Sequence, residues 1–343
     1  MTLATKPGFS ELFLAAQATL SLCEAKPTER VLLYYDTPQD QTLVEAFHTA
    51  CLAVGCEVTA LRVPKGFPDT DPPAIALAAM KAVDLIVDLA TVTWNYAPAT
   101  ADVLASGTRI LQMTDVLQEN IASRPPSEEV YKRARKAEAM LQGGREFRVT
   151  TPEGTDLVCH RGDRRVIAQK GFVDEPGTTD LYANTTIAFA PIETEAEGTL
   201  WLNGPLILYP QYCFVVKEPI RVQVSAGRIV AIEDSHEDAR VFKRWIEQFG
   251  DPNCYVIAHF GFSLDHRSRD ISRFDLSEWE SLYGATMVAF GANDSAVLGG
   301  TNRAKGHADC LLLNSSFYID GQLVLIDGEF TLESGLRASS KAI

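Results

Sequence analysis

The sequence predicts an α/β protein in two parts: an N-terminal doubly wound parallel-sheet domain and a C-terminal β-rich α+β domain. Three observations support this division. Short apolar runs alternate with amphipathic segments in the first third of the chain, and almost only strand-like runs follow. A helical segment at residues 127–142, ended by Gly143 and Gly144, separates the two patterns. With 343 residues, the chain is long enough for two domains that each have a core.

The N-terminal domain, residues 1–145, reads as strands separated by helices. We expect strands at residues 30–36, 57–63, 84–89 and 108–113, and helices at residues 39–54 and 72–82. Strands joined by helical crossovers run parallel. The turn at residues 36–39 has no glycine, and the chain has no dinucleotide-binding or phosphate-loop motif. We therefore expect this domain to bind neither NAD nor ATP, and to serve homo-oligomer assembly and cover a pocket.

The C-terminal domain, residues 146–343, is predicted to be mostly β. Its expected strands are residues 146–151, 156–160, 185–191, 198–202, 220–225 and 228–232, followed by runs around His259 and His307 and by a terminal hairpin. One helix, at residues 235–249, interrupts this pattern. We expect this domain to bind a metal, because strands hold ligands more rigidly than loops do.

The composition is that of a folded globular protein, and it narrows the range of partners. Hydrophobic residues make up 46% of the chain and charged residues 22%. A net charge of -14 disfavours nucleic acid and anionic membranes, because both require clustered Lys and Arg. Seven cysteines at irregular spacings fit a reducing compartment, so we expect a cytoplasmic protein. We see no signal peptide, and no apolar run approaches the length of a membrane span.

Residues 306–313 carry the most informative pattern in the chain. Side chains two apart on a strand share a face, so His307 and Asp309 present an imidazole and a carboxylate side by side. An earlier apolar run, residues 255–262, adds His259. Two histidines and one carboxylate form the facial triad of non-haem Fe(II) oxygenases. The alternative is that these histidines are hydrogen-bonded core residues.

The same two segments resemble a known superfamily. The run GHADCLLLNSSFYIDGQLVLIDGEF is similar to the C-terminal metal segment of the M29 aminopeptidases, and IAHFGFSLD is similar to the segment that carries a metal-binding glutamate in those enzymes. His259 stands at that glutamate position. The exchange of Glu for His marks a side branch, the 2,5-dihydroxypyridine 5,6-dioxygenases, which hold one Fe(II) with two histidines and one aspartate. The resemblance therefore implies a single Fe(II) bound by His259, His307 and Asp309.

Two further positions differ from the peptidase pattern. Thr186 stands where the M29 enzymes carry a glutamate ligand, and the segment from Met287 to Gly291 lacks their usual histidine. A threonine cannot bridge two metal ions as a carboxylate does. The resemblance therefore does not extend to a two-metal peptidase site, and we place Thr186 in the substrate pocket instead.

The resemblance also implies residues that face the substrate. The dioxygenases carry one histidine near an S-G-T-R segment and another in a W-D-H segment. This chain lacks both histidines: Asn95 and Tyr96 precede its S-G-T-R segment, and Leu181 lies in the segment that replaces W-D-H. A flat ring can stack on aromatic side chains or bond to polar ones. We expect the substrate pocket to include Trp94, Asn95, Tyr96, Asp180 and Tyr182. The alternative for the three aromatic residues is a place in a core or an interface.

Two residues are candidates for acid–base catalysis. Glu175, before Pro176 and Gly177, corresponds in the resemblance to an acidic residue of the pocket, although this pattern is also typical of a solvated turn. His266 follows His259 closely and could act beside the metal, although its polar neighbours are also typical of a loop.

These observations favour a mononuclear Fe(II) dioxygenase that uses O2 to cleave the ring of a hydroxylated N-heterocycle, such as a dihydroxypyridine, or of a related aromatic. Two alternatives stay open at this point. One is an M29-type metallo-aminopeptidase, and the other is a relative that binds a ligand without catalysis.

Overall fold

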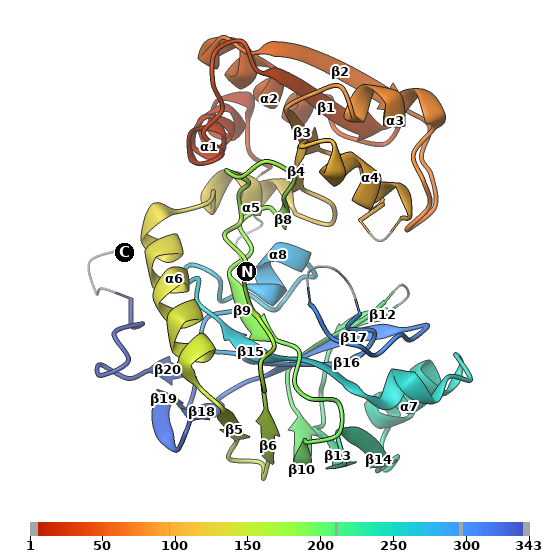
Figure 1. Ribbon diagram of the computed structural model, residues 1–343, viewed down its shortest axis with the longest axis vertical. Coiled ribbons are helices and arrows are strands. Elements are labelled where there is room, and N and C mark those ends of the chain that lie inside the picture. The colour runs from red at the N-terminus through yellow and green to blue at the C-terminus, as the bar shows by residue number, and fades with distance from the viewer. Residues whose placement is uncertain (1–5, 96, 210–211, 295–297, 339–343) are drawn as a thin grey trace. The chain divides into compact units, whose positions relative to one another are not determined.

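The computed structural model describes residues 6–95, 97–209, 212–294 and 298–338 and divides the chain into two compact units (Figure 1). The first unit holds the chain up to Glu129 together with Gln169–Asn184 and Asp275–Glu278. The second unit holds Val130–Ala168, Thr185–Phe274 and the chain from Trp279 onward. The expected fold class is confirmed, because the first unit has a parallel sheet and the second has antiparallel sheets.

The first unit is built on a five-stranded parallel sheet with the order β2-β1-β3-β4-β8. Its strands are β1 (Arg30–Asp36), β2 (Glu57–Val63), β3 (Leu85–Asp88), β4 (Arg109–Gln112) and β8 (Thr179–Leu181). Its helices are α1 (Phe9–Leu22), α2 (Gln41–Val54), α3 (Ala74–Met80), α4 (Ala99–Ala105) and α5 (Gln118–Ser123). Helical crossovers between neighbouring parallel strands make this a doubly wound sheet, as predicted.

The local sequence explains the first crossover. Six of the seven residues of β1 are buried, as is typical of a central parallel strand. α2 begins after Asp40, whose carboxylate accepts a hydrogen bond of 2.8 Å from the backbone N–H of Thr42. The helix ends at Gly55, whose left-handed conformation (φ 95°) is unfavourable for residues with a side chain.

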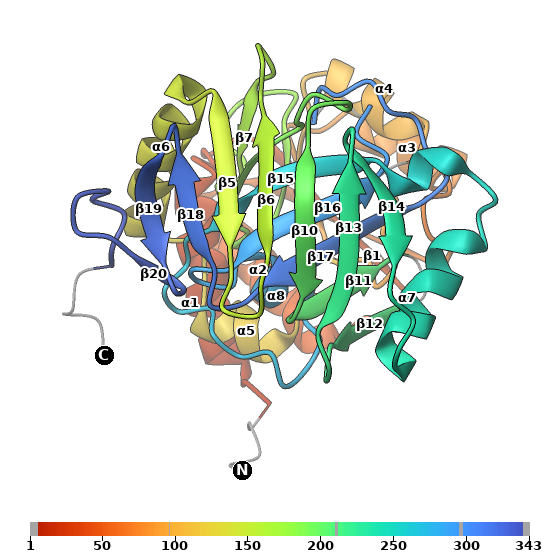
Figure 2. The same cartoon turned by 90° about the horizontal axis from the view of Figure 1, so that it is seen from below.

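The second unit contains two antiparallel sheets that pack face to face, with strands that cross (Figure 2). The eight-stranded sheet has the order β14-β13-β10-β6-β5-β18-β19-β20. Its strands are β5 (Glu146–Thr150), β6 (Asp156–His160), β10 (Glu197–Leu202), β13 (Ile220–Ser225), β14 (Arg228–Ile232), β18 (Ser316–Ile319), β19 (Gln322–Ile326) and β20 (Glu329–Phe330).

The seven-stranded sheet has the order β12-β11-β17-β16-β15-β9-β7. Its strands are β7 (Val166–Ala168), β9 (Thr186–Phe189), β11 (Pro205–Leu208), β12 (Tyr212–Val215), β15 (Ile257–Ser263), β16 (Thr286–Gly291) and β17 (His307–Leu312). The remaining helical segments are α6 (Glu128–Gly143), α7 (Glu237–Glu247), η1 (Pro252–Tyr255) and α8 (Leu276–Glu280). The three candidate metal ligands all lie on this sheet.

The compact units differ in extent from the predicted domains 1–145 and 146–343, which remain a prediction. α6 packs Ala134, Ala137 and Leu141 into the core of the second unit, and the helix after Glu129 therefore belongs to that unit. Gln169–Asn184 then returns to the first unit and adds β8 beside β4. A strand of three residues has too little periodicity to be recognised in a sequence.

Buried phenylalanines join the two sheets of the second unit. Phe147 on β5 meets Phe189 on β9, with ring centroids 4.3 Å apart. Phe317 on β18 meets Phe260 on β15 at 5.2 Å. All four side chains are fully buried, and each such aromatic pair adds about 0.5–1.5 kcal/mol beyond the burial of its area. These contacts determine which face of β15 points into the core.

All seven cysteines are free thiols; six are buried and Cys213 is exposed. No disulfide therefore supports either unit, and stability depends on packing and hydrogen bonds. Within the part of the chain that the structure describes, no helix is both long enough and apolar enough to cross a bilayer.

Asp88 on β3 generates a prediction about pH and stability. The side chain is 1% exposed, and burial raises its pKa to about 7; the Ala90 N–H and Trp94 lower it in part, and Asp36 raises it. An unfolded Asp has a pKa of about 3.9, so the folded chain binds the extra proton between about pH 4 and pH 7. Stability from this group is therefore present at low pH and is lost as the pH rises through that window.

We expect Asp88→Asn to remove this dependence, because the amide oxygen can still accept the 3.1 Å hydrogen bond from Ala90. Between pH 5 and pH 8, the wild-type chain should lose about 2–3 kcal/mol of unfolding free energy that the variant keeps. Urea unfolding of both proteins at the two pH values measures the difference. An equal loss in the variant would contradict the assignment.

Candidate metal centre

The register of three neighbouring strands brings the predicted ligands together. β16 lies between β15 and β17, and it pairs Ala289 with Asp309 and Gly291 with His307. Residues directly opposite each other on antiparallel strands point to the same face. Asp309 and His307 therefore share one face with Ala289 and Gly291.

His259 reaches the same place through an irregularity in β15. Ile257 pairs with Phe290 and Phe260 pairs with Val288, so two residues, Ala258 and His259, lie opposite the single residue between those partners. This is a β-bulge, which bends a strand locally and redirects a side chain. The residue opposite the bulge is Ala289, so His259 and Asp309 flank this alanine from its two sides.

The alternate side chains of these strands point into the core of the second unit. Phe260, Val288 and Cys310 are fully buried there, one from each strand. An apolar residue on each side of a ligand is the pattern that a two-residue period requires. The packed core thus holds the opposite face, with its ligands, in position.

The three ligand atoms lie at distances suited to a single ion. Nε2 of His259 is 2.9 Å from Oδ1 of Asp309, and Nε2 of His307 is 3.4 Å from the same oxygen. Candidate ligand atoms of all three residues lie within 4.8 Å of one another. An octahedral ion with bonds of about 2.1 Å would hold adjacent donor atoms about 3.0 Å apart.

The polar atoms at the site also fit a cation. Oδ1 of Asp309 is buried and receives no hydrogen bond of normal geometry, although both imidazoles lie close to it. Within the described residues, no Lys or Arg pairs with this carboxylate, which is 4% exposed. A buried carboxylate is unfavourable unless a positive charge compensates it, and a divalent ion would supply that charge.

The electrostatics of the triad favour an ionised carboxylate between two imidazoles. Burial lowers the pKa of His259. Burial opposes protonation of His307 too, but Asp309 outweighs it and raises the pKa of that imidazole. The two histidines together hold the pKa of Asp309 well below its usual range, although burial acts in the other direction. The aspartate therefore offers a charged oxygen at neutral pH.

A backbone carbonyl orients His307. Nδ1 of this ring lies 2.9 Å from the carbonyl oxygen of Ala292, so an N–H at Nδ1 donates to that oxygen. This tautomer leaves the lone pair of Nε2 directed at Asp309 and the proposed ion. Ala292 directly follows β16, so the same strand that separates the ligands also orients one of them.

Two small residues of β16 matter near the site, and sequence reasoning missed their role: Ala289 leaves space between the candidate ligands, whereas Gly291 lets the backbone of Gly306 approach. Ala289 is fully buried between the ligands. Gly291 has φ 101°, and a Cβ there would lie 2.0 Å from the carbonyl oxygen of Gly306. The sequence does show two small residues, two apart, in the segment that forms this strand. Their role can be inferred only when the neighbouring strands are known.

The structure places His266 beside α6. Its Nδ1 lies 2.8 Å from a guanidinium nitrogen of Arg133, so the arginine donates to the ring. His266 is not one of the three clustered ligands. Its role as an acid or base stays a prediction.

Thr186 lies at a distance from the ligands along the sheet. It pairs with Ser263, four residues beyond His259 on β15, which corresponds to about 13 Å along a strand. Its hydroxyl donates to the carbonyl oxygen of Glu280 at 2.8 Å. Its predicted contact with substrate stays a prediction.

The other predicted pocket residues belong to the first unit. The hydroxyl of Tyr182 donates to the Ile121 carbonyl oxygen at 2.9 Å, and the ring is 1% exposed. Asp180 accepts hydrogen bonds from the backbone N–H groups of Lys170, Gly171 and Leu181. Both residues therefore stabilise this unit, and their contact with substrate stays a prediction.

Glu175, Trp94 and Asn95 have distinct surroundings in the same unit. The Glu175 side chain is 71% exposed and pairs with Lys170 at 3.2 Å, as a turn residue would. Trp94 is buried, and Asn95 is half-buried. Tyr96 lies outside the described residues. The catalytic and substrate roles predicted for these four residues stay predictions.

The space beside Ala289 can be tested directly. We expect Ala289→Leu to bind Fe(II) at least about tenfold more weakly than the unchanged chain, because the added carbons occupy the position between His259 and Asp309. Ala289→Gly is the matched control and should keep the metal, because it leaves the space open. Metal content after anaerobic loading, with circular dichroism to verify folding, measures both. A folded leucine variant with one tightly bound ion per chain would contradict this geometry.

Comparison with known proteins identifies the family of this chain. Residues 11–332 match the family NicX, described as 2,5-dihydroxypyridine 5,6-dioxygenase. An enzyme of that name from Pseudomonas putida is 29% identical over 272 residues, which cover 77% of this chain and 75% of that protein. The solved structure of 2,5-dihydroxypyridine dioxygenase from Pseudomonas putida KT2440 is similar, with a TM-score of 0.82 and 25% identity over 95% of this chain and 98% of the other.

AmpT from Thermus thermophilus shares the fold, with a TM-score of 0.70 and 16% identity over 94% of this chain and 99% of its own. At that identity the likeness concerns the fold and not the chemistry. The resemblance inferred from the two ligand segments is confirmed by the family match, which extends far beyond them. This chain belongs to the NicX family, the 2,5-dihydroxypyridine 5,6-dioxygenases.

Proposed function

We propose that this chain is a mononuclear Fe(II) dioxygenase that cleaves the ring of a hydroxylated N-heterocycle or a related aromatic with O2. The observation that carries the proposal is the convergence of His259, His307 and Asp309 on one face of three adjacent strands. Family membership supports the reaction class, because relatives are named for ring-cleaving dioxygenation. The ligand set supports iron, since two histidines and one carboxylate are the donors of non-haem Fe(II) oxygenases.

Each ligand residue has a separate task in this proposal. Asp309 supplies the negative charge that holds a divalent ion in a buried site, and the imidazoles supply neutral donors. The Ala292 carbonyl keeps His307 in the tautomer that binds through Nε2. When bound, Fe(II) supplies the redox chemistry that lets O2 react with an electron-rich ring. A three-residue ligand set of this type leaves coordination positions for exogenous groups.

The aminopeptidase alternative is disfavoured by the number of ligands. A two-metal hydrolase needs carboxylates that bridge or flank two ions. In the described part of the chain, the cluster that could hold a metal has three members, of which one is a carboxylate. Thr186 and Met287 stand at positions where the resemblance places peptidase ligands. AmpT therefore supports the fold and not a peptidase activity.

Proton transfer and substrate binding are assigned as further proposals. His266 is the favoured acid–base group, because Arg133 fixes its Nδ1 and so determines the orientation of the ring. Glu175 is the second candidate. Trp94, Asn95, Tyr96, Asp180, Tyr182 and Thr186 are proposed to shape the substrate pocket. A homo-oligomer is proposed as the working assembly.

The proposed reaction is tested with protein loaded anaerobically with Fe(II). We expect O2 uptake together with loss of ring absorbance on addition of 2,5-dihydroxypyridine or of a member of a panel of hydroxylated pyridines and phenols. The panel is needed because Asn95 and Leu181 stand near positions where the resemblance places substrate-facing histidines. Peptide cleavage after Zn(II) or Co(II) loading, with no O2 uptake for any ring, would overturn the proposal.

The ligand assignment has its own variant test. His307→Ala should lose the bound ion and lower the rate more than about 100-fold, because it removes one of three donors. His160→Ala is the control: this histidine is in the same unit, its side chain is 41% exposed, and it should keep both metal and rate. Stoichiometric iron in folded His307→Ala would show that the ion binds elsewhere.

A further inference from the structure

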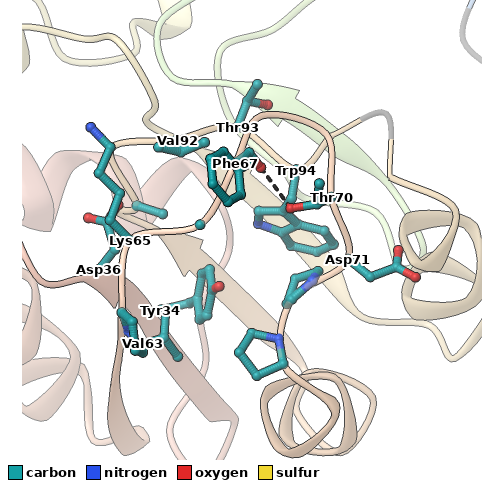
Figure 3. Close-up of a pocket in the computed structure, with 15 residues that line it drawn as sticks. Tyr34, Asp36, Val63, Lys65, Phe67, Thr70, Asp71, Val92, Thr93 and Trp94 are labelled. Carbon is teal, nitrogen blue, oxygen red and sulfur yellow. Dashed lines mark hydrogen bonds between the residues drawn. The ribbon is translucent and has the colours of Figure 1, made fainter.

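The first unit contains a pocket of its own; of the described residues proposed to shape the substrate pocket, Trp94 alone lines it. Its volume is about 290 Å³, and it opens at the carboxyl ends of three parallel strands (Figure 3). Asp36 is the last residue of β1, Val63 is the last residue of β2, and Ala90 follows β3 by two positions. The whole lining comes from residues 34–94, so the pocket is complete within this unit.

The position of the pocket in the sheet is a common binding position. β1 lies between β2 and β3 and pairs with both, so the strand order reverses between β1 and β3. Open α/β sheets bind ligands at the carboxyl ends of strands, where the order reverses in this way. Asp36 ends β1 and Ala90 follows β3, the strands on the two sides of that point.

Three aromatic rings form the walls. Tyr34 and Trp94 are 6% and 4% exposed, and they meet edge to face with centroids 6.3 Å apart. Phe67 is 79% exposed and lies over the pocket near them (Figure 3). The hydroxyl of Tyr34 lines the pocket and has no hydrogen-bond partner within the described residues. A buried phenol normally forms a hydrogen bond, so the hydroxyl of Tyr34 is available to bond to a ligand.

The floor of the pocket carries negative charge without a counter-ion. Asp36 is 2% exposed, and its carboxylate accepts hydrogen bonds from the N–H and the hydroxyl of Thr91, at 3.1 and 2.8 Å. Both donors are neutral, and no Lys, Arg or His in the described residues forms an ion pair with Asp36. Burial, with Asp88 and Asp36, raises the pKa of Tyr34 to about 12, so the phenol stays neutral and can donate.

Lys65 lines the rim but does not neutralise this floor. Its side chain extends away from the three rings (Figure 3). Burial raises the pKa of Asp115, and Lys65 offsets part of that rise, so the ammonium interacts with Asp115. A cationic ligand would therefore meet Asp36 without direct competition from this lysine.

Hydrogen bonds of backbone groups and of two side chains hold the walls of the pocket. The N–H of Asp69 donates to the Thr93 carbonyl oxygen at 2.9 Å, which joins the two segments that form the walls. Thr70 donates to the Phe67 carbonyl oxygen at 2.8 Å (Figure 3), and Asp71 accepts from the N–H of Ala99 at 2.9 Å. A ligand would therefore lose little affinity to reorganisation.

We propose that this pocket binds a small organic cation, an alkylammonium or a pyridinium, with its charge against the rings of Tyr34, Trp94 and Phe67 and beside Asp36. Aromatic faces attract cations electrostatically, and aromatic cages are a known means of binding quaternary ammonium groups. A buried carboxylate strengthens this preference. An anion would meet Asp36 unfavourably, and the turn after β1 offers no glycine amides for a phosphate.

The test measures binding of two cations, 1-methylpyridinium and tetramethylammonium, by titration calorimetry and saturation-transfer NMR. Benzyl alcohol is the neutral control, and benzoate is the anionic control. We expect saturable binding of a cation, with both controls at least about tenfold weaker. Absence of cation binding, or benzoate binding of equal strength, would overturn the proposal.

Two variants locate the site. Asp36→Asn should weaken cation binding at least about tenfold, and it should fold, because the new amide can donate to the hydroxyl of Thr91 and still accept the backbone N–H. Phe67→Ala changes an exposed ring, so it folds in any case, and it should weaken binding about two- to fivefold. Unchanged affinity in both variants would refute the assignment.

Two matched controls complete the design. Asp156→Asn removes an exposed carboxylate of the second unit and should have no effect on cation binding. His307→Ala should also leave cation binding unchanged, because its side chain is in the second unit. Loss of cation binding in His307→Ala would place the cation at the metal centre instead. The test therefore succeeds or fails independently of the dioxygenase proposal.

Discussion

The candidate metal centre depends on the register of β15, β16 and β17. In a strand, successive side chains point to opposite faces, so a slip of one residue would send every ligand into the core and every core residue to the site. The burial of Phe260, Val288 and Cys310 between the two sheets makes such a slip very unfavourable. The ligands are thus held in place by residues that never touch them. The bulge at His259 redirects this side chain toward the site, which a regular strand would not do.

Each unit of this chain has a candidate binding site with a buried carboxylate that has no Lys or Arg partner within the described residues. Asp309 lies between two imidazoles, and Asp36 lies between neutral donors and aromatic rings. Leaving such charges unpaired is unfavourable by several kcal/mol, so their presence points to ligands that bring positive charge. The surroundings differ in a way that selects the ligand. Imidazole nitrogens coordinate metal ions, whereas ring faces and a phenol favour an organic cation.

The sequence was most informative where a pattern has a fixed period. Alternation in residues 306–313 predicted that His307 and Asp309 share a face, and the apolar run around His259 predicted its strand. The crossovers of the first unit followed from strands and helices that end at recognisable residues such as Gly55. These are local properties, and a single segment contains all that is needed to infer them.

The rest required knowledge of which strands become neighbours. Ala289 matters because Asp309 and the bulge at His259 lie on its two sides, and no local pattern specifies those partners. The compact units differ from the predicted domains because α6 packs on the second unit and because β8, three residues long, returns to the first sheet. Likewise, the pocket at Asp36 joins segments from three strands, each of which reads separately as an ordinary strand end.

The same burial that shapes the site also argues for the number of ions in the proposed function. One divalent ion with one carboxylate and two neutral imidazoles leaves a single positive charge in a site of low polarity. Two ions on the same donors would leave three positive charges, which a buried environment disfavours strongly. A second carboxylate would be needed, and Thr186 stands where the resemblance to the peptidases places one. A shared fold, such as the one shared with AmpT, does not by itself decide the chemistry. In this proposal, the ligand residues at a few strand positions decide the chemistry. His259 is the residue that puts a neutral imidazole where the peptidase pattern has a charged glutamate.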